Sequence, residues 1–143
     1  MTTLTLLSLL LTLPLAVGIT HALVLNWNRS SEAINTTVTI TAESEQNFDI
    51  TVPDNDNVVV VAAIDVSQLS LVFIKSDVTI TFKNNDDGTP DDTLTITAGK
   101  PLVWYSGCGL PNPFASGIDV ASFKLTNATA GEATVKIRFA YEV

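Results

Sequence analysis

The chain of 143 residues contains one histidine, His21, and one cysteine, Cys108. A hydrolytic or acyl-transfer site needs a general base, usually histidine, held beside the nucleophile. A zinc site needs several His or Cys ligands. His21 stands among apolar residues, and Cys108 lies between two glycines with no basic neighbour in sequence to activate its thiol. We therefore expect both side chains to be structural and predict that the protein is not an enzyme.

An acidic loop at residues 84–92 is the second candidate for chemistry. It carries four aspartates, Asp86, Asp87, Asp91 and Asp92. Calcium takes six to eight oxygen ligands, and carboxylates supply them. The spacing differs from that of an EF-hand, which places ligands at alternate positions and closes with Glu. We expect a solvated turn, with a calcium site at the four aspartates as the alternative, and predict no other cofactor.

Aromatic and apolar residues near a loop rich in Gly and Pro, residues 107–117, are the third candidate. Two adjacent aromatics precede this loop in a predicted strand at residues 102–105, so they face opposite sides and only one can enter the core. The outward one would suit a ligand or a subunit contact, with packing against the loop as the alternative. The predicted binding or subunit-contact residues are Trp27, Trp104, Tyr105, Leu110 and Phe114.

The elements that must position these residues are strands. Residues 35–42 and 93–97 alternate Thr with larger apolar side chains, which is the period of a half-buried strand. Residues 58–66 are nearly all apolar, as in a strand covered on both faces. No stretch shows helical spacing. About ten short strands with turn signals every 8–12 residues predict an all-β fold, an antiparallel β-sandwich.

A pattern beginning Ile-Asp-Val occurs twice, in residues 64–82 and 118–139. We interpret each copy as a strand, a short turn and an alternating strand. In the first copy this interpretation joins residues 69–74 and 78–82 as a hairpin. Two similar Greek-key halves that share one core predict a jelly-roll-like sandwich.

The chain begins with an uncharged segment, since no Asp, Glu, Lys or Arg precedes Arg29. Residues 4–17 have the apolar character of a signal peptide, and residues 20–22 fit its cleavage pattern, but the usual basic start is missing. A membrane anchor, an apolar arm docked on a partner and an upstream extension are the alternatives. We predict an apolar N-terminal segment, residues 1–22, followed by one sandwich domain, residues 23–143.

Charge narrows the range of partners. Fifteen acidic residues outnumber seven basic ones, for a net charge of −8. Such a surface repels phosphate backbones, so nucleic-acid binding is not expected, and membrane contact is expected only if the N-terminal segment is retained as an anchor. An acidic surface also favours solubility at high local concentration.

Residues 21–29, 89–101 and 119–139 together resemble small, acidic, all-β proteins encoded among the structural genes of tailed bacteriophages. The resemblance covers about residues 19–143 and lies in turns and strand edges. Such proteins are head-decoration or other minor virion components. The resemblance therefore implies a virion location and a homo-oligomer in contact with other virion proteins, and it implies no particular binding residue.

Three functions fit the sequence. The first is a non-enzymatic virion subunit, in capsid decoration or as a minor structural component, that acts through oligomeric surface contacts. The second is an exported β-sandwich module, secreted or on the cell surface, that binds a glycan or another ligand. Glycosylation sequons at Asn28, Asn35 and Asn127 would matter in that setting. The third is a self-assembling surface or pilus subunit whose N-terminal arm pairs as a donor strand.

Overall fold

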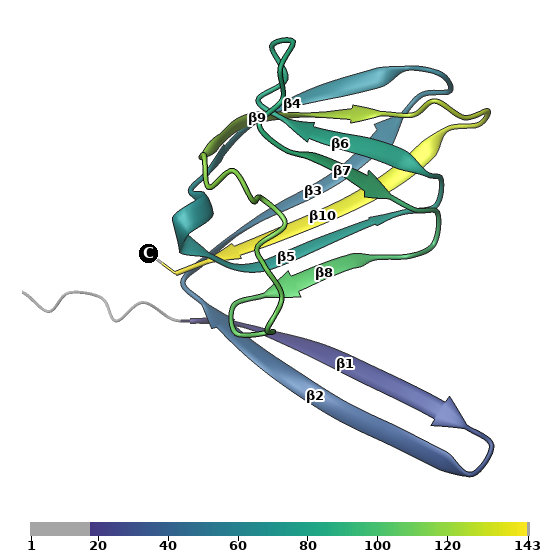
Figure 1. The fold of residues 1–143 in the computed structure, drawn as a ribbon, viewed down its shortest axis with the longest axis vertical. Coiled ribbons are helices and arrows are strands. Elements are labelled where there is room, and N and C mark those ends of the chain that lie inside the picture. Colours follow the sequence, from purple (N-terminus) through teal and green to yellow (C-terminus); the bar gives the residue numbers. More distant parts are fainter. Residues whose placement is uncertain (1–17, 143) are drawn as a thin grey trace, which may run out of the picture.

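The computed structural model describes residues 18–142 (Figure 1). The signal, anchor and donor-strand interpretations of residues 1–17 therefore fall outside the described residues. The described chain forms ten strands and one 3-10 turn, and every strand pairing is antiparallel. The elements are β1 (Ile19–Arg29), β2 (Glu32–Ala42), β3 (Ser44–Val52), β4 (Asn57–Ile64), η1 (Val66–Gln68), β5 (Leu69–Ser76), β6 (Ile80–Asn84), β7 (Thr93–Ile96), β8 (Leu102–Tyr105), β9 (Val120–Thr126) and β10 (Ala133–Tyr141).

Eight of the strands form two four-stranded sheets that pack face to face (Figure 1). One sheet has the order β3-β10-β5-β8, and the other has the order β4-β9-β6-β7. The pairs are nested along the chain: β3 pairs with β10, β4 with β9, β5 with β8 and β6 with β7. The predicted antiparallel β-sandwich is confirmed. A jelly-roll-like arrangement stays a prediction, which the division into four and four strands fits.

The predicted hairpin of residues 69–74 and 78–82 is wrong, because β5 and β6 lie in different sheets. Residues 77–79 carry the chain across the sandwich instead of reversing it within one sheet. Asp77 fixes this corner to the start of β10: its Oδ1 accepts a hydrogen bond from the Thr134 amide at 2.7 Å, and its own amide donates to the Thr134 carbonyl at 3.3 Å. The turn residues therefore mark a corner.

The core lies between the two sheets because the alternating apolar side chains of both point inward. Phenylalanines fill its centre. The Phe82 and Phe123 rings stack with centroids 5.1 Å apart, and Phe48 meets Phe123 edge-on at 5.2 Å. Phe82 and Phe123 are both fully buried. Burying each such side chain contributes roughly 1.5–3 kcal/mol, so this cluster is a main source of stability.

Strands β1 and β2 form a separate two-stranded sheet that projects from the sandwich (Figure 1). We call residues 19–42 the arm. Its register runs from Ile19 opposite Ala42 at the base to Arg29 opposite Glu32 at the tip. The sandwich begins at Ser44, so residues 23–42, which the sequence analysis assigns to it, lie outside its two sheets.

The base of the arm packs on the outer face of the β3-β10-β5-β8 sheet. Ile40 and Ala42 of β2 form a small buried cluster with Leu71 of β5 and Ala140 of β10. Leu23, Val38 and Tyr105 pack against this cluster. This second, minor core holds the arm at one end and leaves the rest of it beyond the sandwich.

Candidate functional site

The two lone reactive side chains lie in different elements. His21 is on β1 opposite Ile40, and its Nε2 lies 3.6 Å from Glu45 Oε2, too far for a hydrogen bond. Cys108 lies in the loop after β8, with its Sγ 3.9 Å from the Leu110 carbonyl oxygen. Within residues 18–142, no group of three or more His, Cys, Asp or Glu side chains could hold a metal ion.

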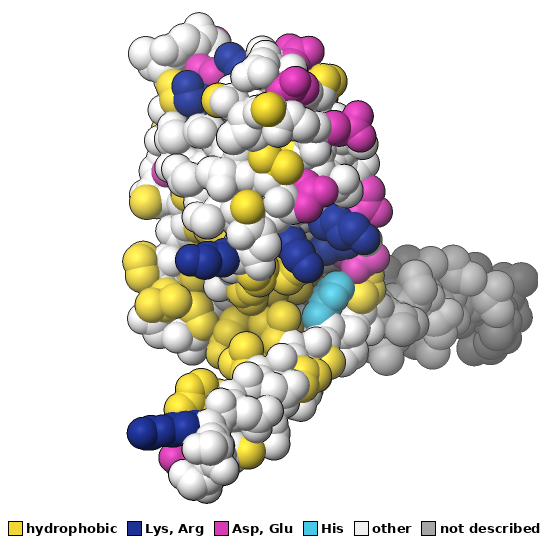
Figure 2. All heavy atoms as spheres, turned by 90° about the vertical axis from the view of Figure 1, so that its right-hand side faces the viewer, with side chains coloured by type: hydrophobic (Ala, Val, Ile, Leu, Met, Phe, Trp, Pro, Cys, Tyr) yellow, Lys and Arg dark blue, Asp and Glu magenta, His cyan; other side chains and the backbone are white. Residues whose placement is uncertain are grey.

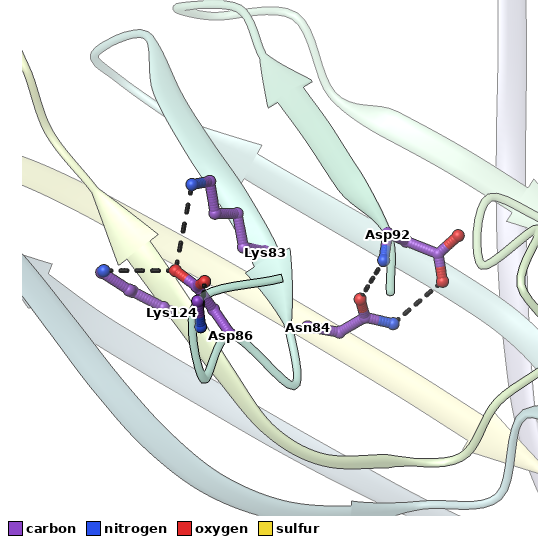
Figure 3. Close-up of polar contacts among 6 residues, drawn as sticks. Lys83, Asn84, Asp86, Asp92 and Lys124 are labelled. Carbon is purple, nitrogen blue, oxygen red and sulfur yellow. Dashed lines mark hydrogen bonds and ion pairs between the residues drawn. The ribbon is translucent and has the colours of Figure 1, made fainter. Parts of the chain in front are cut away.

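In the acidic loop, Asp86 forms ion pairs. Its Oδ2 lies 3.2 Å from Lys124 Nζ and 3.9 Å from Lys83 Nζ (Figure 3). The hydrogen bond from Lys124 is the main cause that lowers the pKa of this carboxyl below its ordinary value. Asp86 therefore ties the loop to β6 and β9.

Asp92 belongs to a second cluster on the same loop. Asn84 Nδ2 donates to its Oδ2 at 2.9 Å, and the Asp92 amide donates back to Asn84 Oδ1 (Figure 3). Ser116, from the long loop between β8 and β9, donates to it through both its amide (3.0 Å) and its hydroxyl (2.5 Å). Asp92 thus joins two loops that are distant in sequence.

The other two aspartates make separate contacts. Asp91 Oδ2 accepts a hydrogen bond from Asn85 Nδ2 at 2.7 Å, and Asn85 Oδ1 accepts one from the Ala121 amide at 2.8 Å. The backbone amide of Asp87 donates to the Asn85 carbonyl at 3.0 Å. Three of the four aspartates predicted as calcium ligands thus bind donors of the protein itself, and the four are not brought together around one point.

The hydrogen bonds of Asp92 predict a pH dependence of stability. Burial opposes its ionisation, but the bonds from Ser116 and Asn84 outweigh burial and lower its pKa from 3.8. Because the pKa is lower in the folded state, Asp92 stabilises the fold above about pH 3.8 and loses this contribution as the pH falls through the folded value. We expect Asp92→Asn to lower the free energy of unfolding by about 1–2 kcal/mol at pH 7 and to flatten its decline below pH 4.

Urea unfolding at pH 7, 4.5 and 3 measures this effect. Asp87→Asn, in the same loop but outside these hydrogen bonds, is the matched control and should follow the wild-type curve. An Asp92→Asn curve parallel to that of the wild type at all three pH values would show that Asp92 contributes nothing to acid sensitivity.

The five residues predicted as contacts lie in three different environments: the core, the base of the arm and the exposed surface. Phe114 is 1 % exposed, with its ring centroid 5.8 Å from that of Phe82 and 6.0 Å from that of Phe139. Its assignment to a contact surface is wrong, because it is part of the core. Trp104 packs against the same core and donates from Nε1 to the Leu110 carbonyl at 3.0 Å.

Tyr105 faces the opposite side of β8 and packs against the base of the arm. Trp104 and Tyr105 face opposite sides of β8, as predicted, and the structure shows that Trp104 is the inward residue. Leu110 and Trp27 are the two predicted contact residues that are largely exposed, at 65 % and 47 % of their full surface. Of these, Trp27 lies within a larger exposed apolar surface.

That surface is one face of the arm, which we call the apolar face. It contains Ile19, His21, Leu23, Leu25 and Trp27 of β1, and Ile34, Thr36, Val38, Ile40 and Ala42 of β2. Beyond the base, Leu25 is 51 % exposed and Ile34 is 53 % exposed. The opposite face is mostly Thr and Asn, with Val24 at 60 % exposure as its large apolar residue.

Leu25 and Ile34 are not among the site residues predicted from the sequence. The signal was present, because apolar residues alternate along both strands of the arm and define one face. Alternation of apolar residues predicts that one face of a strand is buried. It does not show whether the residues that bury this face belong to the same chain.

The outer face of the β3-β10-β5-β8 sheet continues beyond the base of the arm. Along β5 the outward residues after Leu71 are Phe73, partly exposed, and Lys75, exposed. Lys136 of β10 stands opposite Lys75. Figure 2 shows an apolar hollow between the sandwich and the arm, with Lys and Arg side chains along its sandwich side.

We call this hollow the arm crevice, the space between the apolar face of the arm and the outer face of that sheet. Where β2 meets the ends of β5 and β8, a hollow of about 230 Å³ is lined by residues from both faces of the arm, Thr39 and Thr41 among them. Tyr105 lines it together with Ser70, a fully buried side chain whose hydroxyl has no hydrogen-bond partner among the described residues.

A scan against protein-family models, a search of the curated proteins and a search of the solved structures each find no match to this chain. No helix within residues 18–142 is long and apolar enough to span a membrane. What the protein does has therefore to be inferred from its own surfaces.

Proposed function

We propose that this protein is a non-enzymatic structural subunit of a virion, either a capsid-decoration protein or a minor structural component, that acts through contacts between subunits. The single observation that carries the proposal is the arm, which projects from a closed sandwich and leaves Leu25, Trp27 and Ile34 about half exposed.

An isolated two-stranded sheet is only marginally stable in water, and an exposed apolar face adds to its instability. Covering the face with another protein removes both problems. A projecting arm therefore fits a protein that is completed by assembly, and it has no evident use in a protein that works as a separate monomer.

The charge distribution supports the same function. The arm carries one basic and one acidic residue, Arg29 and Glu32, so the net charge of −8 lies outside it. A strongly acidic body keeps copies soluble and apart at high local concentration, while a neutral arm can enter a contact without charge repulsion. Symmetric repetition in a shell would then strengthen a contact that is weak by itself.

The virion is proposed because residues 21–29, 89–101 and 119–139 resemble acidic all-β structural proteins of tailed bacteriophages. The antiparallel sandwich agrees with the fold that the resemblance implies.

Mass spectrometry of purified virus particles from the source of the gene tests the proposal. We expect the chain in the particles at a fixed ratio to the major capsid protein, because a symmetric lattice fixes the number of its sites. Recovery of the chain in the culture medium or the cell envelope, without residues 1–22 and without any in particles, would overturn the virion role and favour the exported binding module. The particle-free supernatant of the same preparation is the control for contamination.

A further inference from the structure

We propose that the free edge of β4 binds an extended segment of another protein, which adds to the sheet as a further strand. The segment has a short apolar centre with Lys or Arg at each end. The binding edge belongs to the β4-β9-β6-β7 sheet, whereas the arm packs on the other sheet (Figure 1). The inference therefore goes beyond the proposed function and does not depend on a location in the virion.

The four outer strands of the sandwich differ in how they are protected against pairing with another chain. An edge strand exposes unpaired backbone groups, and proteins protect it by keeping it short or by placing charged side chains on it. Strands β7 and β8 have four residues each, and β3 carries Glu45 and Asp49. Strand β4 has eight residues, no charge and no proline, and residues 58–61 are all valine. It is therefore the edge best suited to accept a further strand.

The open stretch of β4 is its first part, residues 57–61. Here β4 keeps a regular register with β9, and an irregularity between Val61 and Ile64 ends the regular pairing. Val59 is 61 % exposed, and Val61, at 86 %, is the most exposed large apolar side chain within residues 18–142. Both valines lie on the same face of the strand, because they are two residues apart. The neighbouring side chains of an added strand would cover them.

The backbone of β4 bonds outside the sheet near the two ends of the strand. The Asn57 amide donates to Asp56 Oδ1 at 2.7 Å, and the Ala63 carbonyl accepts a hydrogen bond from Gln46 Nε2 at 2.7 Å. For the valines between them, no backbone hydrogen bond other than those of the sheet is found in the described part of the chain. A strand that pairs there would displace no hydrogen bond.

Negative charge stands at both ends of the same edge. Four exposed aspartates lie there, two before β4 and two after it: Asp54, Asp56, Asp65 and Asp119. None of the four forms an ion pair with a residue of the described chain. Lys124, which stands opposite Val59 on β9, is already paired with Asp86. The ends of the edge therefore favour a partner with positive charge at both ends.

A hollow of about 350 Å³ lies at the end of β4, between Asp65 and Asp119. Asp65 Oδ1 accepts hydrogen bonds from the amide and hydroxyl of Ser67, and Asp119 Oδ1 accepts one from the Val66 amide. The Oδ2 atoms of both aspartates accept none from residues 18–142. Apolar residues line the rest of the hollow. It suits a Lys or Arg side chain, which has an apolar stem and a charged head.

The same charges disfavour other occupants. A second copy that paired edge to edge would bring carboxylates against carboxylates in either strand direction, because both ends of β4 are acidic. The first 28 residues of this chain contain no Lys or Arg to place at those ends. A nucleic acid or an anionic membrane is repelled by the aspartates. A segment of another protein with basic ends is the occupant that fits.

Fluorescence anisotropy with a labelled peptide and the full chain tests the proposal. The probe is the fluorescein-labelled peptide Lys-Lys-Thr-Val-Thr-Val-Thr-Lys-Lys, whose five central residues match the length of the open stretch. We expect it to bind, because main-chain hydrogen bonds supply affinity and the lysines reach the aspartates. Two control peptides are expected not to bind: one has Glu in place of every Lys, and the other is N-methylated at alternate central residues, so that it cannot pair as a strand.

Two pairs of matched variants locate the binding on the chain. Val61→Lys places a charge on the free edge, whereas Val24→Lys places the same charge on an exposed valine of the arm. We expect Val61→Lys to raise the Kd of the basic peptide roughly 10-fold or more, and Val24→Lys to leave it unchanged. Asp65→Asn should raise the Kd about 5-fold, and Glu32→Gln at the tip of the arm should not.

Thermal unfolding by circular dichroism checks that each variant keeps the sandwich. Failure of the basic peptide to bind the wild type would overturn the proposal. Equal binding of the N-methylated peptide would exclude strand addition, and equal binding of the Glu peptide would exclude a basic partner. Equal loss of binding in Val61→Lys and Val24→Lys would show attraction to the whole acidic chain and not to β4. None of these outcomes bears on whether the chain is present in virus particles, so the two proposals can fail separately.

Discussion

Replacing Asn127 with Ala is expected to lower the free energy of unfolding by about 4 kcal/mol, because it leaves several buried polar groups without partners, at about 1–3 kcal/mol each. Asn127 follows β9 and is fully buried. Its Nδ2 donates to the carbonyl oxygens of Gly131 (2.7 Å) and Pro53 (3.1 Å), and its Oδ1 accepts from the Thr129 amide (3.1 Å).

These bonds join two turns that are distant in sequence. The Asn127 amide also donates to the Asp56 carbonyl at 2.9 Å, so one residue holds the β3–β4 turn against the β9–β10 turn. The Ala variant keeps this backbone bond and loses the side-chain bonds. The expected loss therefore reports the side chain alone.

Urea unfolding at neutral pH, followed by circular dichroism, measures the change. Asn47→Ala is the matched control: its amide bonds only the exposed Glu45 carboxylate, so a change within about 0.5 kcal/mol is expected. A loss below 1 kcal/mol for Asn127→Ala would mean that water satisfies the backbone groups left without Asn127 and that the two turns stay in contact without its side chain.

The side-chain amide of Asn127 is also too buried to carry a glycan in the folded chain. The sequon at Asn127 therefore does not support an exported glycoprotein.

Phe114→Ala is expected to lower the free energy of unfolding by about 3–5 kcal/mol, the usual cost of a cavity left by a buried aromatic side chain. Phe114 lies in the long loop before β9, yet its ring packs with those of Phe82 and Phe139, one from each sheet. The loop is thus fixed to the core by this side chain.

Leu110→Ala, in the same loop, provides the contrast because Leu110 is 65 % exposed. We expect it to change stability by no more than about 0.5 kcal/mol. Chemical denaturation of both variants measures the difference. Equal and small effects would return Phe114 to the exposed contact surface that the sequence predicts.

The fold class could be predicted from sequence because alternation reports directly which side of a strand is buried. Residues 93–97 illustrate this: Leu94 and Ile96 face inward in β7 as their spacing indicates. The partner of a strand is not encoded in the same way. Residues 75–77 have the composition of a tight turn, and such residues bend the chain equally well at a hairpin and at a corner between sheets.

The candidate site was only partly predictable. Trp27 can be singled out from sequence because it is a large aromatic residue in a predicted strand, and its role as a contact residue stays a prediction. Phe114 is wrongly placed on the surface because a loop rich in Gly and Pro has no periodicity that separates buried from exposed residues. The arm itself could not be predicted. Its strands alternate like those of the sandwich, and only the hydrogen-bonding partners in the three-dimensional structure place them in a sheet of their own.

The nested strand order has a consequence for biosynthesis. Contacts between β3 and β10 join residues such as Phe48 and Arg138, 90 positions apart, so the first strand of the sandwich leaves the ribosome long before its partner exists. Until then its edge and apolar side are open to other nascent chains, and such distant pairings also form slowly. We expect expression at low temperature, or with chaperones that hold unfinished chains, to raise the yield of folded protein.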